Sequence, residues 1–188
     1  YKLSDGTYKA VVYSSPVHYE EAGEWKDIDN RITVDGKSKE NRYSANIDGV
    51  EFSFPDKPTR NERIRINKNG KELSFGYIEE NISVFSSSEI ISSDKKNTAD
   101  GITEKTAEAT VLSRDILKYN NISGLTDIEY ELNSSILKES IIVPSKQNEY
   151  VYKFSFDIGD LTPVIKDDGS ILLIDKNNSD KLEYVITA

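Results

Sequence analysis

The only histidine of the chain, His18, is the first residue whose chemistry must be considered. It stands close to Glu20 and Glu21, so a histidine–carboxylate dyad is conceivable. A nucleophilic mechanism also needs a cysteine or an activated serine. The chain has no cysteine, and none of its serines stands in a nucleophile-elbow context. We therefore interpret His18 as a strand histidine near a sheet edge and predict no catalytic residue.

Two acidic loops contain the oxygen ligands that calcium prefers. The loop Asp175–Asp180 places such ligands at alternate positions, as the first half of an EF-hand loop does. However, its sixth position is Asp180 instead of glycine, and its twelfth is Ile186 instead of glutamate. Asp, Asn and Ser also dominate ordinary turns, in this loop and in Asp94–Asp100. The sequence favours turns at both places and predicts no metal site, although calcium binding by either loop stays open.

Three aromatic residues, Tyr13, Tyr19 and Trp25, could form a platform on which sugar rings stack. Residues of these types more often pack inside a core or across a hairpin. A glycosidase, the weaker alternative, would use a pair of carboxylates. With 33 acidic residues, close pairs occur in any fold, so composition cannot identify such a site.

The stretch from Thr126 to Phe156 contains the clearest pattern among the elements that would position these residues. Acidic and apolar residues alternate strictly through the segment 127–132, which places Ile128, Tyr130 and Leu132 on one face of a strand. The alternation resumes from Tyr150 to Phe156 after the connecting run 136–143. This pattern is typical of an antiparallel sheet with one face in a core and one in water.

Three turn dipeptides predict β-hairpins in the first half of the chain. They are Asp35-Gly36, Asp48-Gly49 and Asn69-Gly70, each between extended runs. Nearer the C-terminus, Gly159-Asp160 and Pro163 are expected to break the chain. No segment has an apolar period of 3.6 residues over the length of a helix, and the segment 113–118 is the only candidate for a helical turn. The fold class predicted is all-β: a mostly antiparallel β-sandwich, or an enlarged one.

The segment 86–105 is polar and rich in serine, so we predict a long surface loop there. We expect residues 1–188 to form one domain, with this loop as the only plausible boundary for a subdivision. The chain contains no methionine and no signal peptide, which suggests a fragment of a longer protein.

The net charge of −9 argues against nucleic acid or an anionic membrane as the main partner. No apolar run reaches about 18 residues, so no membrane span is expected. Neither is a cofactor. The apolar fraction is low, at 36%, but 11 tyrosines and 6 phenylalanines supply large buried areas and argue against a disordered chain.

The block from Gly6 to Asn30 resembles a conserved segment of large secreted proteins of Gram-positive bacteria. The shared residues are Gly-Thr-Tyr, then Pro-Val-His-Tyr, then a glycine, a tryptophan and Ile-Asp-Asn. The family includes wall-associated, RHS (YD-repeat) and polymorphic-toxin-type proteins. Segments 125–130, 137–141 and 168–171 are similar to the continuation of that region, while residues 37–105 are not covered. The motif would place Trp25 and Ile28 in a core, with Asp29 and Asn30 capping a turn.

This resemblance implies a non-catalytic structural or presentation module of a large exported surface or toxin-delivery protein, secreted or associated with the cell wall. The implied partners are adjoining domains of the same polypeptide. The alternative is a carbohydrate-binding module that uses Tyr13, Tyr19 and Trp25, for which the partner would be a cell-wall or other polysaccharide.

Overall fold

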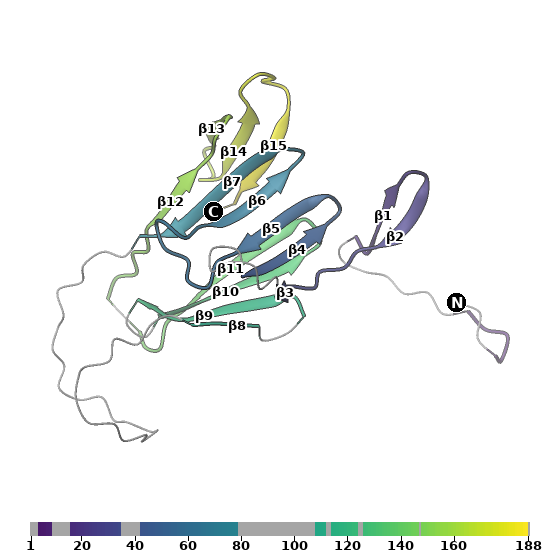
Figure 1. Ribbon diagram of the computed structural model, residues 1–188, viewed down its shortest axis with the longest axis horizontal. Coiled ribbons are helices and arrows are strands. Elements are labelled where there is room, and N and C mark those ends of the chain that lie inside the picture. The colour runs from purple at the N-terminus through teal and green to yellow at the C-terminus, as the bar shows by residue number, and fades with distance from the viewer. Residues whose placement is uncertain are drawn as a thin grey trace.

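The computed structural model describes residues 4–8, 16–34, 42–78, 108–111, 114–123, 126–146 and 148–187. Within these residues the chain consists of β-strands and their connections and contains no helix. The strands form four antiparallel sheets of six, four, three and two strands (Figure 1). The predicted all-β, sandwich-like fold class is confirmed.

The largest sheet is a meander with one added strand. Consecutive strands β3 to β7 pair as neighbours, and β12 pairs with the free edge of β7. Their bounds are Thr33–Val34 (β3), Tyr43–Ile47 (β4), Val50–Phe54 (β5), Ile64–Lys68 (β6), Lys71–Tyr77 (β7) and Phe154–Asp157 (β12). In β5 the residues alternate between buried and more exposed, because one face lies on the core.

The four-stranded sheet has the order β11-β10-β9-β8. Its strands are Glu108–Val111 (β8), Ile116–Ser123 (β9), Thr126–Asn133 (β10) and Ile136–Ile142 (β11). The strict alternation predicted for β10 is confirmed, since Ile128, Tyr130 and Leu132 are buried and the acidic residues between them are only partly buried. Lys118 on β9 pairs with two of these acidic side chains, at 3.0 Å from Asp127 and 3.6 Å from Glu129.

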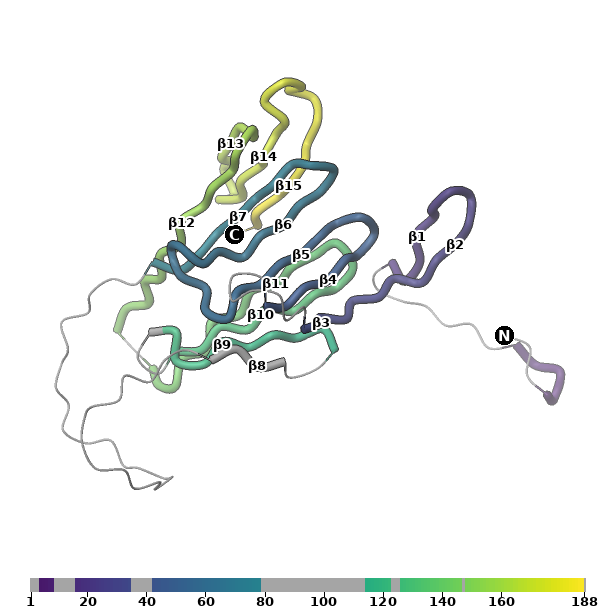
Figure 2. The backbone as a smooth tube through the Cα atoms, in the orientation of Figure 1, coloured from purple at the N-terminus to yellow at the C-terminus, as the bar shows by residue number. Residues whose placement is uncertain are grey.

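The remaining strands make two small sheets, whose paths are followed most easily in Figure 2. The C-terminal sheet contains β13 (Leu161–Ile165), β14 (Ile171–Asp175) and β15 (Leu182–Ile186) in that order. The N-terminal hairpin pairs β1 (His18–Glu21) with β2 (Glu24–Asp27) and lies apart from the three larger sheets.

One apolar face of the six-stranded sheet packs against the four-stranded sheet, and aromatic rings fill the space between them. The ring of Tyr130 lies 6.2 Å from that of Phe54, 6.1 Å from that of Phe75 and 6.0 Å from that of Tyr119. The buried hydroxyl of Tyr119 donates a hydrogen bond to the carbonyl oxygen of Pro55 at 2.7 Å. The apolar face of each sheet is thus buried against the apolar face of the other.

Two of the three predicted hairpin turns are confirmed. Both residues of Asp48-Gly49 and of Asn69-Gly70 have positive φ angles, as a type I′ turn requires, and the strands on either side pair directly. The turn at 35–36 and the predicted loop at 86–105 lie outside the described residues.

Three local predictions are wrong. The segment 113–118 contains no helical turn among its described residues, because Ile116 already begins β9. The alternation from Tyr150 gives a strand only from Phe154 onward. Pro163 was expected to break the chain, yet it lies in β13; this is an edge strand, where a missing N–H can face away from the neighbouring strand.

Candidate functional site

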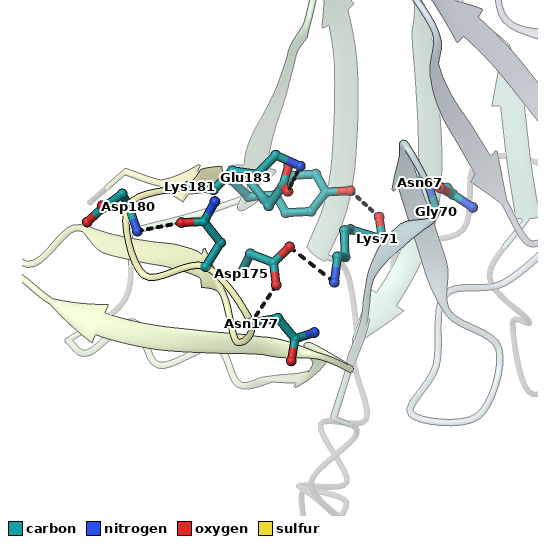
Figure 3. Close-up of polar contacts among 10 residues, drawn as sticks. Asn67, Gly70, Lys71, Asp175, Asn177, Asp180, Lys181 and Glu183 are labelled. Carbon is teal, nitrogen blue, oxygen red and sulfur yellow. Dashed lines mark hydrogen bonds and ion pairs between the residues drawn. The ribbon is translucent and has the colours of Figure 1, made fainter.

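A cluster of polar contacts lies where the C-terminal sheet meets the β6–β7 hairpin (Figure 3). The ammonium of Lys71 lies 3.3 Å from the carboxylate of Asp175 at the end of β14. On the neighbouring strand β15, the hydroxyl of Tyr184 donates to the carbonyl oxygen of Lys71 at 2.5 Å and contacts that of Ile66 at 3.3 Å. These contacts join two sheets that share no strand pairing. We call Lys71, Asp175 and Tyr184 the junction cluster.

Asp175 also begins the loop that was considered for calcium. Its carboxylate accepts the backbone N–H of Asn177 at 2.8 Å, and Asn178 accepts that of Asp180 at 3.2 Å in the same manner. The hydrogen bond from Asn177, together with Lys71, holds the pKa of Asp175 below its usual value although burial opposes the shift. The loop is therefore built as a pair of Asx turns.

Grouped metal ligands are absent from the part of the chain that the structure describes, where no three His, Cys, Asp or Glu residues are placed to hold an ion. The other acidic loop, 94–100, lies outside the described residues.

A β-bulge turns one more charged residue toward the protein interior. The register between β14 and β15 shifts after the pair Leu173–Tyr184, so that Ile174 pairs with Leu182 and Glu183 is the extra residue. The side chain of Glu183 is buried, and Lys181 lies 2.5 Å from its Oε1 atom. The contact with this carboxylate raises the pKa of Lys181. The bulge thus buries a carboxylate, whereas the lysine side chain that pairs with it stays 47% exposed.

The N-terminal hairpin carries two of the predicted ligand-binding residues but does not bring them together. Tyr19 pairs with Lys26, whereas Trp25 pairs with Glu20, so the two aromatic side chains point to opposite faces. The third, Tyr13, lies outside the described residues. A continuous platform of Tyr19 and Trp25 is therefore not formed on this hairpin.

Trp25 is 73% exposed, so the expectation that it lies in the core is wrong. A two-stranded hairpin has no second layer to cover either face, which is the physical reason for the exposure. On the face of Trp25, His18 Nε2 lies 2.9 Å from Asp27 Oδ1, and both side chains are more than half exposed. The imidazole therefore has a carboxylate neighbour but no enclosed pocket.

The residues after the hairpin attach it to the sandwich. Ile28 packs against the core as predicted. Asp29 caps its own turn, because its carboxylate accepts a hydrogen bond from the backbone N–H of Arg31 at 3.1 Å. The amide oxygen of Asn30 accepts one from the backbone N–H of Ser134, in the distant β10–β11 turn, at 3.0 Å. The Arg31 guanidinium lowers the pKa of Asp29. Asp29 and Arg31 also border a shallow polar groove, whose other side-chain contributors include Thr33, Ser44, Asn46 and Glu51.

The residues of the junction cluster were not selected from the sequence as a group. Lys71 follows a turn and Tyr184 alternates with Leu182 and Ile186, which indicates only a strand. Local spacing cannot show that positions more than a hundred residues apart meet. Of the cluster, only Asp175 was considered, and for a different role.

Comparison of the chain with protein-family models, with curated proteins and with solved structures found no match in any of the three. Over the described residues, no helix is long and apolar enough to cross a membrane.

Proposed function

We propose that this chain is a non-catalytic structural or presentation module of a large exported bacterial protein, at the cell surface or in a toxin-delivery system. Its partners are adjoining domains of the same polypeptide. The segment Gly6–Asn30 supports the bacterial and exported parts of the proposal, through its resemblance to secreted surface proteins of Gram-positive bacteria.

The observation that carries the proposal is that polar side chains of the described residues join sheets and strands to one another. Lys71, Asp175 and Tyr184 join two sheets, with the carboxylate that could have served a metal held by an ammonium and a backbone N–H. The guanidinium of Arg63 reaches the carbonyl oxygens of Ser74 and Ser155 at 3.4 and 3.3 Å, which links β7 to β12. Such contacts stabilise a rigid scaffold, which is what a positioning module needs.

A carbohydrate-binding module is the second candidate, because Trp25 is exposed on a face that it shares with Glu20 and Asp27. An indole ring flanked by carboxylates can stack on a sugar ring and accept hydrogen bonds from its hydroxyls. Among the described residues, the separation of Tyr19 from Trp25 leaves this candidate site with one aromatic residue.

Tryptophan fluorescence with acrylamide quenching separates the two candidates, since Trp25 is the only tryptophan. The isolated chain should emit at long wavelength and be strongly quenched. Cell-wall and plant polysaccharides should change neither property if the module is structural. Glycan binding would be established if one polysaccharide protected Trp25 from quenching and also pulled down the natural chain but not the W25A variant. That result would refute the structural proposal.

A further inference from the structure

The edge strands of the sheets differ in how well they are protected from pairing with another strand. In the C-terminal sheet, β13 contains Pro163 and β15 contains the bulge that buries Glu183. In the other sheets, β3 is two residues long, and β8 and β12 have four each. Proline, bulges, inward charges and short length all keep an edge unpaired. Among the strands that the structure describes, the longest edge strand is β11, with seven residues.

The backbone of β11 presents a regular row of hydrogen-bonding groups at the edge of its sheet. Its register with β10 is unbroken over all seven residues. Leu132 of β10 donates its N–H toward β9, to the carbonyl oxygen of Asp115. The alternation of an antiparallel ladder therefore turns the N–H and C=O groups of Leu137, Glu139 and Ile141 away from β10. None of the described residues forms a backbone hydrogen bond with these groups.

One charged side chain lies on the inward side of this edge. Leu137 and Ile141 pack against the core, as expected for residues on the same side as the buried face of β10. Between them lies Glu139, whose carboxylate accepts a hydrogen bond from the Tyr130 hydroxyl at 2.6 Å. An inward-pointing charge on an edge strand opposes the addition of a further strand. Glu139 is therefore placed where its charge state controls access to the edge.

The surroundings of Glu139 favour its neutral form. Burial raises the pKa of Glu139, although the hydrogen bond from Tyr130 acts in the opposite direction. The nearby charges of Glu131 and Lys138 point to the other face of the sheet, where they pair with each other at 3.4 Å. From the six-stranded sheet, the aromatic ring of Phe75 packs against Tyr130. Among the described residues, no cation compensates the Glu139 carboxylate.

Two copies of β11 match each other in one antiparallel register. A two-fold axis through Glu139 places Ile136 opposite Ile142 of the second copy, and Leu137 opposite Ile141. Ile136 and Ile142 are 60% and 38% exposed, so this contact would cover them. An axis one residue to either side loses both of these apolar pairs. The matching register also brings the two Glu139 side chains next to each other, where like charges repel.

We propose that β11 is a strand-pairing surface for a second copy of this chain, and that the charge of Glu139 prevents the pairing at neutral pH. Two adjacent carboxylates resist ionising together, so pairing takes up protons and strengthens as the pH falls. Main-chain hydrogen bonds and the apolar pairs then join two four-stranded sheets into one. This inference goes beyond the proposed function and does not depend on it.

The expected dimer is weak, because the contact is a single pair of strands. It falls well short of the roughly 800 Å² per partner that stable complexes bury. With the charge removed, we expect a Kd of roughly 0.1 mM. Pairing therefore matters where copies of the chain are concentrated.

Removal of the charge at Glu139 tests the proposal at neutral pH. Sedimentation equilibrium follows the isolated chain at pH 7 from about 10 to 500 µM. The natural chain should be mostly monomeric, whereas E139Q should dimerise about tenfold more tightly because the two facing charges are gone. Glutamine retains an oxygen that can accept the Tyr130 hydrogen bond. Far-UV circular dichroism checks that the variant is folded.

Two further variants serve as controls. E51Q removes the same charge from an exposed position on the six-stranded sheet and should remain as monomeric as the natural chain. E139Q/I136K/I142K places lysines opposite each other across the axis and should be monomeric again. Both isoleucines are exposed, so these lysines should leave the fold intact.

The pH dependence gives a second comparison. Lowering the pH from 7 to 5.5 should tighten dimerisation of the natural chain but not of E139Q, which has no carboxylate at the axis. This range lies above the isoelectric point of about 4.8, so the chain keeps a net negative charge throughout.

Several results would overturn the proposal. E139Q could remain monomeric at the highest concentration, or dimerise no more tightly than the natural chain. A dimer that persists in E139Q/I136K/I142K would mean that the copies meet through another surface. Amide exchange locates the contact: the N–H groups of Leu137 and Ile141 should exchange more slowly as E139Q dimerises. Unchanged exchange at both positions in the dimer would refute the pairing of β11.

Discussion

Replacement of Gly76 by alanine tests the packing of the β5–β6 connection on the outer face of β7. A Cβ atom at this position would lie 1.9 Å from the carbonyl oxygen of Thr59 and 2.8 Å from its carbonyl carbon. Real contacts of this kind are essentially never closer than 3.0 Å, so the two segments must separate by about 1.1 Å (3.0 minus 1.9). The obstacle is main chain, and no side-chain rotation relieves it.

Both segments are held in place, which makes the separation costly. On one side, the turn after Pro58 is closed by hydrogen bonds from Thr59 N to Glu62 O at 2.8 Å and from Glu62 N to Thr59 Oγ1 at 3.0 Å. On the other, β7 is paired with both β6 and β12. We expect G76A to lower the free energy of unfolding by about 2–3 kcal/mol. For a chain of this length, that corresponds to a fall in Tm of roughly 4–12 °C.

Urea unfolding followed by far-UV circular dichroism measures this change; the fluorescence of Trp25 reports only the hairpin. G70A is the matched control, because Gly70 has a φ of +77° and nothing within 4 Å of an added Cβ. It should cost about 1 kcal/mol through backbone strain alone. The double variant T59A/G76A should show no rescue. A G76A protein within about 0.5 kcal/mol of the natural chain would refute the steric reasoning.

Three further predictions concern the core, the acid stability and the Asp175–Asp180 loop. L132A should lower the free energy of unfolding by about 2–5 kcal/mol, because Leu132 is fully buried, whereas I136A on the exposed edge strand should change it by less than about 0.5 kcal/mol; urea unfolding compares them. Burial favours protonation of Asp127, but hydrogen bonds from a backbone N–H and a lysine outweigh it and lower its pKa. Its contribution is thus present above the unfolded carboxyl value of 3.8 and is lost as the pH falls through the lower folded value. D127N should cost about 1 kcal/mol at pH 7 and flatten the acid limb of a stability–pH curve; an unchanged limb would contradict this assignment. Millimolar calcium should leave Tm unchanged, because the Asp175 carboxylate already pairs with Lys71 and accepts a hydrogen bond from a backbone N–H. A calcium-dependent rise in Tm that the D175N substitution abolishes would show a calcium site.

Local signals in the sequence predicted most of the strands. The alternation at 127–132 and the turns Asp48-Gly49 and Asn69-Gly70 depend on neighbours only a few residues away, and their strands have the expected bounds and pairing. Reasoning from local signals missed β13, because proline interrupts a central strand but is tolerated in an edge strand, where Pro163 lies. Whether a strand lies at an edge depends on the order of strands in the sheet.

The candidate site shows the same division. Residues 175–180 were correctly interpreted as turns, because an Asx turn is a contact between residues two positions apart. That Asp175 is also bound by Lys71 could not be read locally, because the pair is separated by more than a hundred residues. The resemblance of the Gly6–Asn30 block to secreted proteins implied a core position for Trp25, yet its side chain is exposed on a two-stranded hairpin.

The sequence by itself thus determined the fold class, the positions of the hairpin turns and the inward face of β10, because a strand's two-residue period and the φ angles of turns are properties of short segments. Only the tertiary structure decided which apolar surfaces are covered. In β14 the run from Ile171 to Ile174 is apolar on both sides, and the sequence alone does not distinguish its two faces. Packing against the six-stranded sheet buries Leu173 and leaves the side of Leu172 outward, because a sheet can meet that neighbour with only one of its faces.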